Sequence, residues 1–244
     1  MAEMKDWARF WEVYPKRVGG TDFLEQVGKT VKGQPITDVQ FKRILSQIGD
    51  QLHLEKDDTL LDLCCGNGLI TKELGRSCRM VVGIDFSQPL VDVANQHHQA
   101  ANVVYQRMNV LELDKLPPMV PGLFSKVLMY EALQNFRKQD LKRLLGNVLK
   151  LSSRDVVILL GSIPDHARKW RFYNTPKRKL AHLARRMLGT DPIGTWWKRG
   201  DIHTTCKQFG LQCKFQEQHK ELHTSHYRFD AVMFRTENVG PEIQ

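Results

Sequence analysis

The chain has 244 residues, which is enough for one large α/β domain and too few for two full catalytic domains. Its hydrophobic content of 41% and charged content of 26% are ordinary for a soluble protein, and no apolar run approaches the roughly 20 residues that a membrane span requires. We therefore expect neither a membrane-spanning protein nor a disordered one.

The net charge of +9 is concentrated in one segment. Residues 166–200 contain ten basic residues and a single acid, Asp191, so this segment alone carries +9. The rest of the chain contains 26 basic and 26 acidic side chains, whose charges cancel. We therefore attribute the basic character to an insertion at about 166–200 and not to the core of the domain.

The cysteines and the first residues bear on the compartment. Residues 1–14 interleave charged residues with Trp7 and Trp11, and so lack the uninterrupted apolar core of a signal peptide. The five cysteines, of which Cys64 and Cys65 are adjacent, form no paired framework and are typical of free thiols in a reducing compartment. These features predict a cytoplasmic location.

Residues 1–55 predict an N-terminal helical cap of two or three helices. The clearest of them is an amphipathic helix over 38–52, with Asp38 at its start. A connection that contains several glycines and Pro35 precedes it. We expect the catalytic domain to follow at 56–244.

From Thr59 the pattern changes to short apolar runs separated by helical stretches, as in βαβ units around a buried parallel sheet. Strands are expected at 60–64, 80–85, 103–108, 126–130 and 156–161, followed after the insertion by a helix near 201–209 and strands from 211 and near 228–234. The last two strands are too close in sequence for a crossover helix, which predicts an antiparallel hairpin. We therefore expect a doubly wound α/β fold with a mostly parallel seven-stranded sheet and an antiparallel hairpin at its C-terminal edge.

The first strand leads into a glycine-bearing loop, Asp62-Leu63-Cys64-Cys65-Gly66-Asn67-Gly68, before a helix at Leu69. Glycines let the backbone turn tightly and let a ligand approach it, while the helix N-terminus offers unpaired N–H groups. Nineteen residues after Gly66, the second strand ends at Asp85, whose carboxylate can accept two hydrogen bonds from ribose hydroxyls. This arrangement predicts a nucleotide-like ligand, and Thr71, where a dinucleotide fingerprint has a third small residue, speaks against NAD.

The loop and Asp85 together resemble the class I S-adenosylmethionine-dependent methyltransferases. Their first motif is Asp/Glu-x-x-x-Gly-x-Gly, followed by an acid at the end of the second strand, and the resemblance covers 59–161. It implies a Rossmann-like fold and S-adenosylmethionine as the cofactor. It also implies which part of that cofactor each motif residue would contact. Gly66 and Gly68 would line the methionine portion, and Asp62 would lie beneath the loop near the ammonium group. Asp85 would hold the ribose.

At other positions that the resemblance would place near the cofactor, the chain matches the family less closely. Phe86 would pack near the adenine, and Asn109 stands where the family usually has an Asp that reaches the adenine amino group; an amide oxygen can accept the same hydrogen bond. After the fourth strand the family often has Leu-His-His-Phe, whereas this chain has Tyr130 to Phe136 without a histidine. The cofactor-binding residues expected on this basis are Asp62, Cys64, Gly66, Gly68, Asp85, Phe86, Asn109, Val110 and Tyr130.

The residues that would catalyse the transfer are less clearly marked. Methyl transfer is an in-line displacement in which positioning contributes roughly 7–11 kcal/mol at best, so no dedicated catalytic residue is required. An oxygen acceptor still benefits from a base, by about 10²–10⁴-fold, and His203, Glu131 and His226 are the candidates. The histidines around His223 do not have the spacing of a known zinc site, so we predict no metal.

The basic insertion contains one further pattern. Residues 176–188 place leucines, Ala184 and Met187 on one side of a helix and six Lys, Arg and His residues on the other. Three interpretations remain open: a lid over the active site, a surface that meets anionic lipid or an anionic substrate, or a helix packed on the core with a basic exterior.

Together these features predict a methyltransferase that acts on a small-molecule or glycan/lipid-linked acceptor, more at oxygen than at nitrogen, and that could touch a membrane peripherally through the basic helix. An RNA or other nucleic-acid methyltransferase is the main alternative, but the chain has Tyr130-Glu131-Ala132-Leu133 where nucleobase amino methyltransferases typically have Asp/Asn-Pro-Pro-aromatic. A non-catalytic interaction protein with this fold is the other alternative, against which the intact loop and Asp85 argue.

Overall fold

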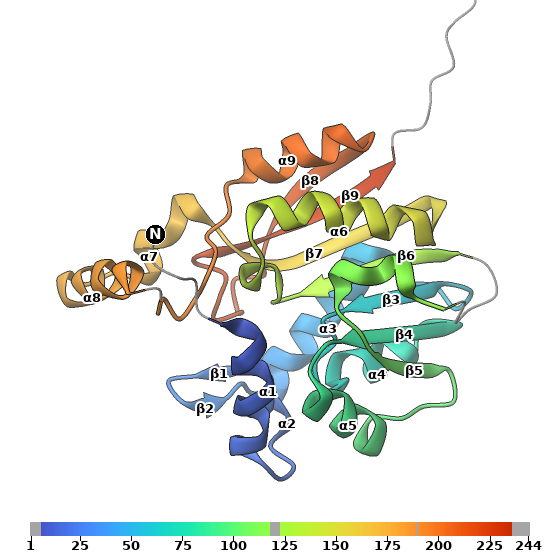
Figure 1. Ribbon diagram of the computed structural model, residues 1–244, viewed down its shortest axis with the longest axis horizontal. Helices are drawn as coiled ribbons and strands as arrows, with labels where there is room; N and C mark the ends of the chain where they lie inside the picture. Colours follow the sequence, from blue (N-terminus) through green and yellow to red (C-terminus); the bar gives the residue numbers. More distant parts are fainter. Residues whose placement is uncertain (1–5, 118–122, 189, 236–244) are drawn as a thin grey trace, which may run out of the picture.

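The computed structural model describes residues 6–117, 123–188 and 190–235; the ends of the two predicted domains, at 1–5 and 236–244, lie outside the described residues. Its centre is a seven-stranded sheet in the order β5-β4-β3-β6-β7-β9-β8 (Figure 1). The strands are β3 (Thr59–Leu63), β4 (Met80–Asp85), β5 (Val103–Arg107), β6 (Phe124–Tyr130), β7 (Ser152–Pro164), β8 (Leu211–Glu217) and β9 (Arg228–Arg235).

Five strands, from β5 to β7, run parallel, while β9 pairs antiparallel with both β7 and β8. The predicted mostly parallel sheet with an antiparallel C-terminal hairpin is therefore confirmed. The chain builds the sheet outward from β3 to β5 and then returns to add β6 on the other side of β3. Ligands bind at such a reversal of strand order, beyond the carboxyl ends of the strands.

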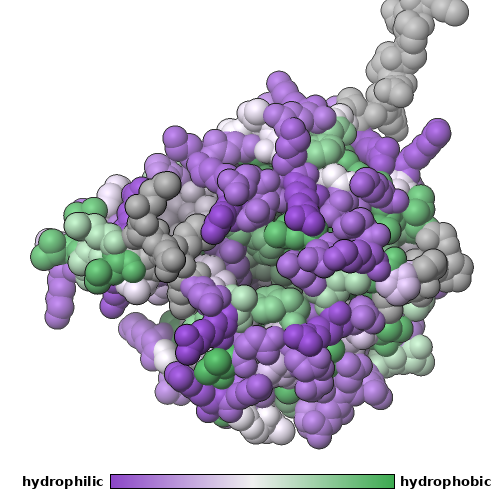
Figure 2. Space-filling model, viewed as in Figure 1, coloured by the Kyte–Doolittle hydropathy of each residue, from purple (hydrophilic) through white to green (hydrophobic). Residues whose placement is uncertain are grey.

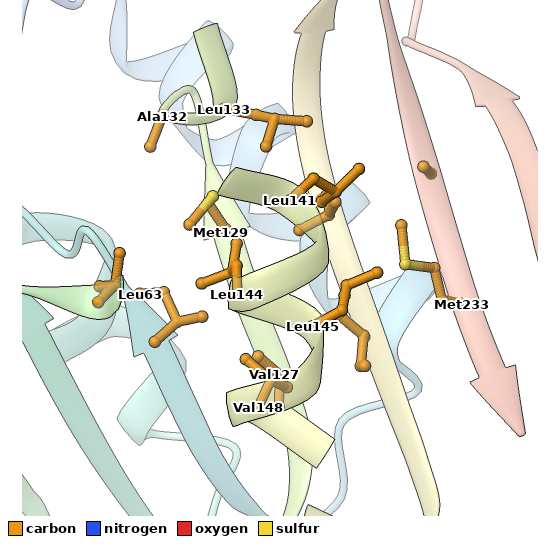
Figure 3. Close-up of a cluster of buried hydrophobic side chains, with 14 of the residues drawn as sticks. Leu63, Val127, Met129, Ala132, Leu133, Leu141, Leu144, Leu145, Val148 and Met233 are labelled. Atoms are coloured by element: carbon orange, nitrogen blue, oxygen red, sulfur yellow. The ribbon is translucent and has the colours of Figure 1, made fainter. Parts of the chain in front are cut away.

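Helices cover both faces of the sheet, as the predicted doubly wound fold requires. On one face lie α6 (Lys138–Leu151) and α9 (Arg199–Gln208). The leucines of α6 and Val148 point at the central strands, where Val127 and Met129 meet them (Figure 3). On the other face lie α3 (Asp38–Leu52), α4 (Leu69–Gly75) and α5 (Gln88–His97).

The N-terminal part, where two or three helices were predicted, has the helices α1 (Trp7–Val18), α2 (Phe23–Gln26) and α3, and a small hairpin of β1 (Thr30–Val31) and β2 (Gln34–Pro35). With two residues in each strand, this hairpin has no periodicity that a sequence pattern could reveal. The buried face of α3 contributes Ile44 and Ile48 to the same cluster as strand residues of the sheet. The cap and the sheet therefore share one core.

The strand β7 is longer than predicted. It begins at Ser152, directly after α6, and its residues Arg154 and Asp155 are exposed. Because these residues are charged, the apolar pattern first becomes visible at Val156.

The basic segment contains a 3-10 turn at His166–Arg168, then α7 (Lys169–Phe172) and α8 (Pro176–Met187). In Figure 1, α8 projects from the body beyond the carboxyl end of β7. The interpretation of α8 as a helix packed on the core by its apolar side is wrong, because Leu180 is 70% and Met187 is 79% exposed. The side that carries His182, and not the apolar side, adjoins the body, since His182 is 2% exposed.

Candidate functional site

A cavity of about 360 Å³ lies at the carboxyl ends of β3, β4 and β6, where the strand order reverses. The loop after β3, the end of β4, the segment after β5 and the end of β6 form its walls, and α1 covers it. Of the nine residues predicted to bind the cofactor, eight line this cavity: Asp62, Cys64, Gly66, Asp85, Phe86, Asn109, Val110 and Tyr130. One cavity therefore gathers residues from four separate strand ends.

The loop after β3 needs glycine at Gly66. Its φ is +59°, and a Cβ at this position would lie 2.9 Å from a methyl group of Val27. The Gly66 N–H donates to Asp85 Oδ2 at 2.9 Å, which ties the loop to the end of β4. Asn67 is completely buried and donates to the Phe23 carbonyl at 2.8 Å. The loop is therefore held from both sides, with its backbone facing the cavity.

Gly68 is the exception among the predicted cofactor residues, since it is absent from the residues that line the cavity. It is the N-cap of α4 at φ +77°, and a Cβ would lie 2.6 Å from the ring of Tyr105. The Tyr105 hydroxyl donates to the Gly68 carbonyl at 3.2 Å. The structure thus gives this glycine a role in turning the chain and in leaving room for Tyr105, while its contact with the cofactor stays a prediction.

Two carboxylates lie buried in one wall of the cavity. Asp85 is 5% exposed and accepts hydrogen bonds at 2.9 Å from the N–H groups of Gly66 and Ser87. Asp62 is 3% exposed and accepts one at 2.6 Å from the Thr71 hydroxyl. Burial raises the pKa of Asp62 to about 7 and that of Asp85 to about 6, because their hydrogen bonds offset only part of the desolvation. A ligand that brings a cation or hydroxyl groups to this wall would stabilise both.

The thiols of Cys64 and Cys65 also line the cavity, and Cys64 has φ +58°, unusual for a residue with a side chain. Burial raises the pKa of both thiols well above the usual range. They are therefore protonated near neutral pH and are weak nucleophiles.

Opposite the loop, Glu131 follows β6 with φ +55° and also lines the cavity. Lys29 Nζ lies 2.5 Å from Glu131 Oε2, and the Ser162 hydroxyl donates to Oε1 at 3.3 Å. Burial opposes ionisation of Glu131, but the charges of Lys29 and Arg228 outweigh it and lower its pKa to about 2. With that pKa the carboxylate is a weak base near neutral pH, although it is the one predicted catalytic residue found in the cavity.

The other two predicted catalytic residues lie away from the cavity. The helix α9 turns Ile202 and Cys206 into the core, so His203 faces solvent. His226 is also exposed and packs its ring against Tyr227 in the segment before β9. Neither histidine lines the cavity, so neither can accept a proton there in this conformation.

Several lining residues were not predicted from the sequence. Trp7 and Trp11 from α1, with Leu111 and Phe136, give the cavity an apolar and aromatic side. The spacing of the two tryptophans, one helical turn apart, could have indicated a shared face. Asn135 also lines the cavity, and its buried side-chain oxygen has no hydrogen-bond partner among the described residues, so it retains the capacity to accept one.

The comparison with protein families gives one match, to the methyltransferase domain, over residues 60–154. Among curated proteins, the chain is similar to an uncharacterized methyltransferase of Schizosaccharomyces pombe, with 43% identity over 60 residues, 24% of this chain and 21% of the relative. It is similar to the 23S rRNA (uracil(1939)-C(5))-methyltransferase of Psychromonas ingrahamii, with 39% identity over 38% of this chain and 19% of the relative. It is also similar to the ubiquinone biosynthesis O-methyltransferase of Coxiella burnetii, with 33% identity over 38% of this chain and 39% of the relative. The matched segments thus span about a fifth to two fifths of these relatives.

Solved structures extend the similarity of fold to nearly the whole chain. An S-adenosylmethionine-dependent methyltransferase of Anabaena variabilis superposes with a TM-score of 0.65 at 17% identity, covering 97% of this chain and 98% of that one. The magnesium protoporphyrin IX methyltransferase of Synechocystis with bound S-adenosylhomocysteine gives 0.60 at 14% identity, covering 93% and 97%. Residues 60–154 thus match a methyltransferase domain, and nearly the whole chain has the fold of class I S-adenosylmethionine-dependent methyltransferases. This fold brings the glycine loop after β3 and the acid at the end of β4 to one place.

The cavity fits the cofactor of the family. The cofactor carries an ammonium group and ribose hydroxyls, and the wall offers the buried Asp62 and Asp85, with the free oxygen of Asn135 close by in the lining. Among the described residues, His, Cys, Asp and Glu side chains do not gather in groups of three or more that could hold a metal ion. In the same part of the chain, the helices lack the length and apolar character needed to cross a membrane.

Proposed function

We propose that the chain is an enzyme that transfers a methyl group from S-adenosylmethionine to a small-molecule acceptor, or to one linked to a glycan or lipid, at oxygen rather than nitrogen. The observation that carries the proposal is the convergence of Asp62, Gly66 and Asp85 on one cavity. The five cysteines are free thiols, which supports the predicted cytoplasmic location.

S-adenosylmethionine, when bound, supplies a methyl group on a sulfonium centre. Asp85 accepts hydrogen bonds from the ribose hydroxyls, and Asp62 compensates the ammonium charge from beneath the loop. Phe86 and Val110 enclose the adenine. Asn109 supplies an amide oxygen there, which already accepts a hydrogen bond from the Leu111 N–H at 3.0 Å and has a second lone pair.

The acceptor is held on the side of the cavity formed by α1 and by the residues after β6. Trp7, Trp11 and Phe136 offer flat apolar surfaces for the body of the acceptor. The ammonium of Lys29 lies in the same lining, 5.0 Å from the centre of the Tyr130 ring. Because a cation stabilises an oxyanion and disfavours a nearby protonated amine, this arrangement supports an oxygen acceptor that loses its proton before or during transfer.

Catalysis in this proposal rests on positioning and on the field of Lys29, without a neutral base. Glu131 holds Lys29 in place through their ion pair. The similarity to a ubiquinone biosynthesis O-methyltransferase supports transfer to oxygen.

Methylation of RNA is the second candidate, favoured by the similarity to a 23S rRNA methyltransferase and by the basic segment. A phosphate backbone would engage the basic side chains of α8 but would leave its apolar side in water. For this reason we rank a smaller acceptor first.

The test is calorimetric titration of the purified full chain with S-adenosylmethionine and, separately, with NAD. We expect binding of S-adenosylmethionine alone, and a drop in affinity on the order of 100-fold or more in the variant Asp85→Asn, since each hydrogen bond to a charged group contributes about 1.5–3 kcal/mol. Asp57→Asn is the matched control, because Asp57 is exposed at the opposite, amino end of β3. Preference for NAD, or equal affinity in the two variants, would overturn the proposal.

A further inference from the structure

An apolar ridge runs along the outer side of α8. It consists of Leu180, Leu183 and Met187 with Leu188 directly after the helix, and we call these four side chains the α8 ridge. They are 70%, 51%, 79% and 73% exposed, respectively. In Figure 2 they appear as the hydrophobic patch at the end of the molecule where Figure 1 shows α8. A cluster of large apolar side chains in solvent marks an interaction site.

The orientation of α8 is fixed by its opposite side. His182 is 2% exposed and stacks on the ring of Tyr173 at 4.2 Å between centroids. Its Nδ1 lies 2.7 Å from the carboxylate of Asp191, which also accepts a hydrogen bond at 2.8 Å from the Tyr173 hydroxyl. Because helical residues advance by about 100° each, His182 lies across the helix from Leu180 and Met187. The α8 ridge therefore faces directly away from the body.

Basic side chains flank the α8 ridge. The helix carries five exposed basic residues and no acid: Lys177, Arg178, Lys179, Arg185 and Arg186. On the helical wheel, Lys179 and Arg186 adjoin the ridge on one side and Lys177 on the other. The one acid of the whole segment, Asp191, is engaged by His182 and Tyr173. A partner must therefore offer an apolar layer and negative charge at its rim.

We propose that α8 docks the chain onto an anionic lipid bilayer, with the helix in the plane of the interface, the α8 ridge among the acyl chains and the basic side chains at the phosphate groups. A basic amphipathic helix with this arrangement binds membrane surfaces both by burying its apolar side chains and by electrostatic attraction to anionic lipids. A second copy of the chain fits less well, because two helices of like charge would repel and four side chains offer much less than the roughly 800 Å² per partner of a stable interface. The proposal does not depend on methyl transfer, and cofactor titration tests that activity separately.

The experiment is flotation of the purified full chain with vesicles of phosphatidylcholine alone and of phosphatidylcholine with 30% phosphatidylglycerol. We expect binding to the anionic vesicles, weakened by raised salt, and little binding to the neutral ones. The variant Leu183→Ser/Met187→Ser should reduce binding by about tenfold or more, since each buried CH₂ contributes about 0.8 kcal/mol. The variant Lys179→Gln/Arg186→Gln should reduce binding to the anionic vesicles alone.

Two matched controls keep the test specific. Val39→Ser removes an apolar side chain that is 68% exposed on α3, and Lys142→Gln/Arg143→Gln removes two exposed charges from α6. Both should bind vesicles as the parent does. Equal binding to neutral and anionic vesicles, or binding that the α8 variants leave unchanged, would overturn the proposal. So would a dimer in light scattering that the Leu183→Ser/Met187→Ser variant dissociates, or binding to an RNA oligomer that needs the charges but not the α8 ridge.

Discussion

The wall of the cavity and the outer side of α8 both depart from the rule that polar residues lie outside and apolar residues inside. The wall buries polar groups, whereas α8 exposes apolar ones. At the wall, the carboxyl side chains of Asp62 and Asp85 belong to residues that are no more than 5% exposed. On α8, Leu180 and Met187 are apolar groups left almost entirely in water. Burying a carboxylate and exposing a leucine are both unfavourable for the isolated chain, so each region is complete only with something bound to it.

The two regions differ in what holds them. The cavity wall is fixed by hydrogen bonds and ion pairs among its own buried groups, such as Lys29 with Glu131 and Gly66 with Asp85. Among the described residues, the side chains of the α8 ridge make no such contacts, and the helix is held through its opposite side, where His182 meets Tyr173 and Asp191. Substitutions in the first region should therefore affect folding, binding and pH dependence, whereas substitutions in the second should affect only what the molecule docks onto.

Among substitutions in these two regions, the largest effect on stability is expected for Lys29→Met. It leaves Glu131, whose side chain is 21% exposed, without its nearest cation, at a cost of roughly 2–4 kcal/mol in the free energy of unfolding at pH 7, somewhat below the roughly 3–5 kcal/mol of a fully buried pair. Adding Glu131→Gln to that variant removes the stranded charge and should restore most of the loss. Urea unfolding of the parent, both single variants and the double variant measures this coupling. Additive effects of the two substitutions would show that the pair does not act as a unit, and would remove the role proposed for Glu131.

The pH dependence of cofactor affinity sharpens the contrast further. Burial raises the pKa of Asp62 to about 7 and of Asp85 to about 6 in the free protein. The ionised carboxylates hold the ammonium and ribose groups, so binding releases protons, and affinity is highest above pH 7 and falls as pH falls through 7 and 6. We expect affinity for S-adenosylhomocysteine, which retains both groups, to be about tenfold or more weaker at pH 5.5 than at pH 8.

Calorimetry at four or five pH values checks this dependence. The variant Asp62→Asn should bind more weakly at every pH and show a flatter profile, because only Asp85 then titrates in the range. Binding of the parent protein that strengthens at acidic pH would contradict the proposed role of both carboxylates.

The same carboxylates give the stability of the free protein a pH dependence opposite to that of cofactor affinity. Their pKa values in the folded protein lie above the ordinary value of 3.8, so their contribution to stability is fully present at acidic pH, below that value. It is lost as pH rises through 6 and 7. The cofactor should therefore raise the melting temperature more at pH 8 than at pH 5.5.

How far the sequence predicts this molecule depends on the range of the interactions. The strands and the glycine loop follow from local patterns, the alternation of apolar runs and the spacing from Gly66 to Asp85. The contact of Lys29 with Glu131 joins residues 102 positions apart, and no local pattern encodes it. Likewise, the sequence shows that α9 carries His203 but not that Ile202 and Cys206 take the inner side of the helix.

The orientation of α8 shows the same limit. Periodicity correctly predicts an amphipathic helix near 176–188, and in most proteins the apolar side of such a helix faces the core. Here His182 takes that place, because Tyr173 and Asp191 provide a ring and a carboxylate for it. The contacts of one polar residue, His182, with Tyr173 before it and Asp191 after it thus decide which way five basic and four apolar side chains point.

The smallest effect is expected for the stability of Leu183→Ser/Met187→Ser, the variant that should bind vesicles least. Because these side chains are already 51% and 79% exposed, the free energy of unfolding should change by no more than about 0.5 kcal/mol. Leu144→Ser on α6, where the leucine is 1% exposed, is the contrasting variant and should cost about 2–5 kcal/mol. Urea unfolding measures both. A loss above 2 kcal/mol in the α8 variant would mean that the α8 ridge packs against the body in solution, which would favour a lid over a membrane contact. A negligible loss would mean that the α8 ridge has no role in the fold. Its four apolar side chains must then serve a partner.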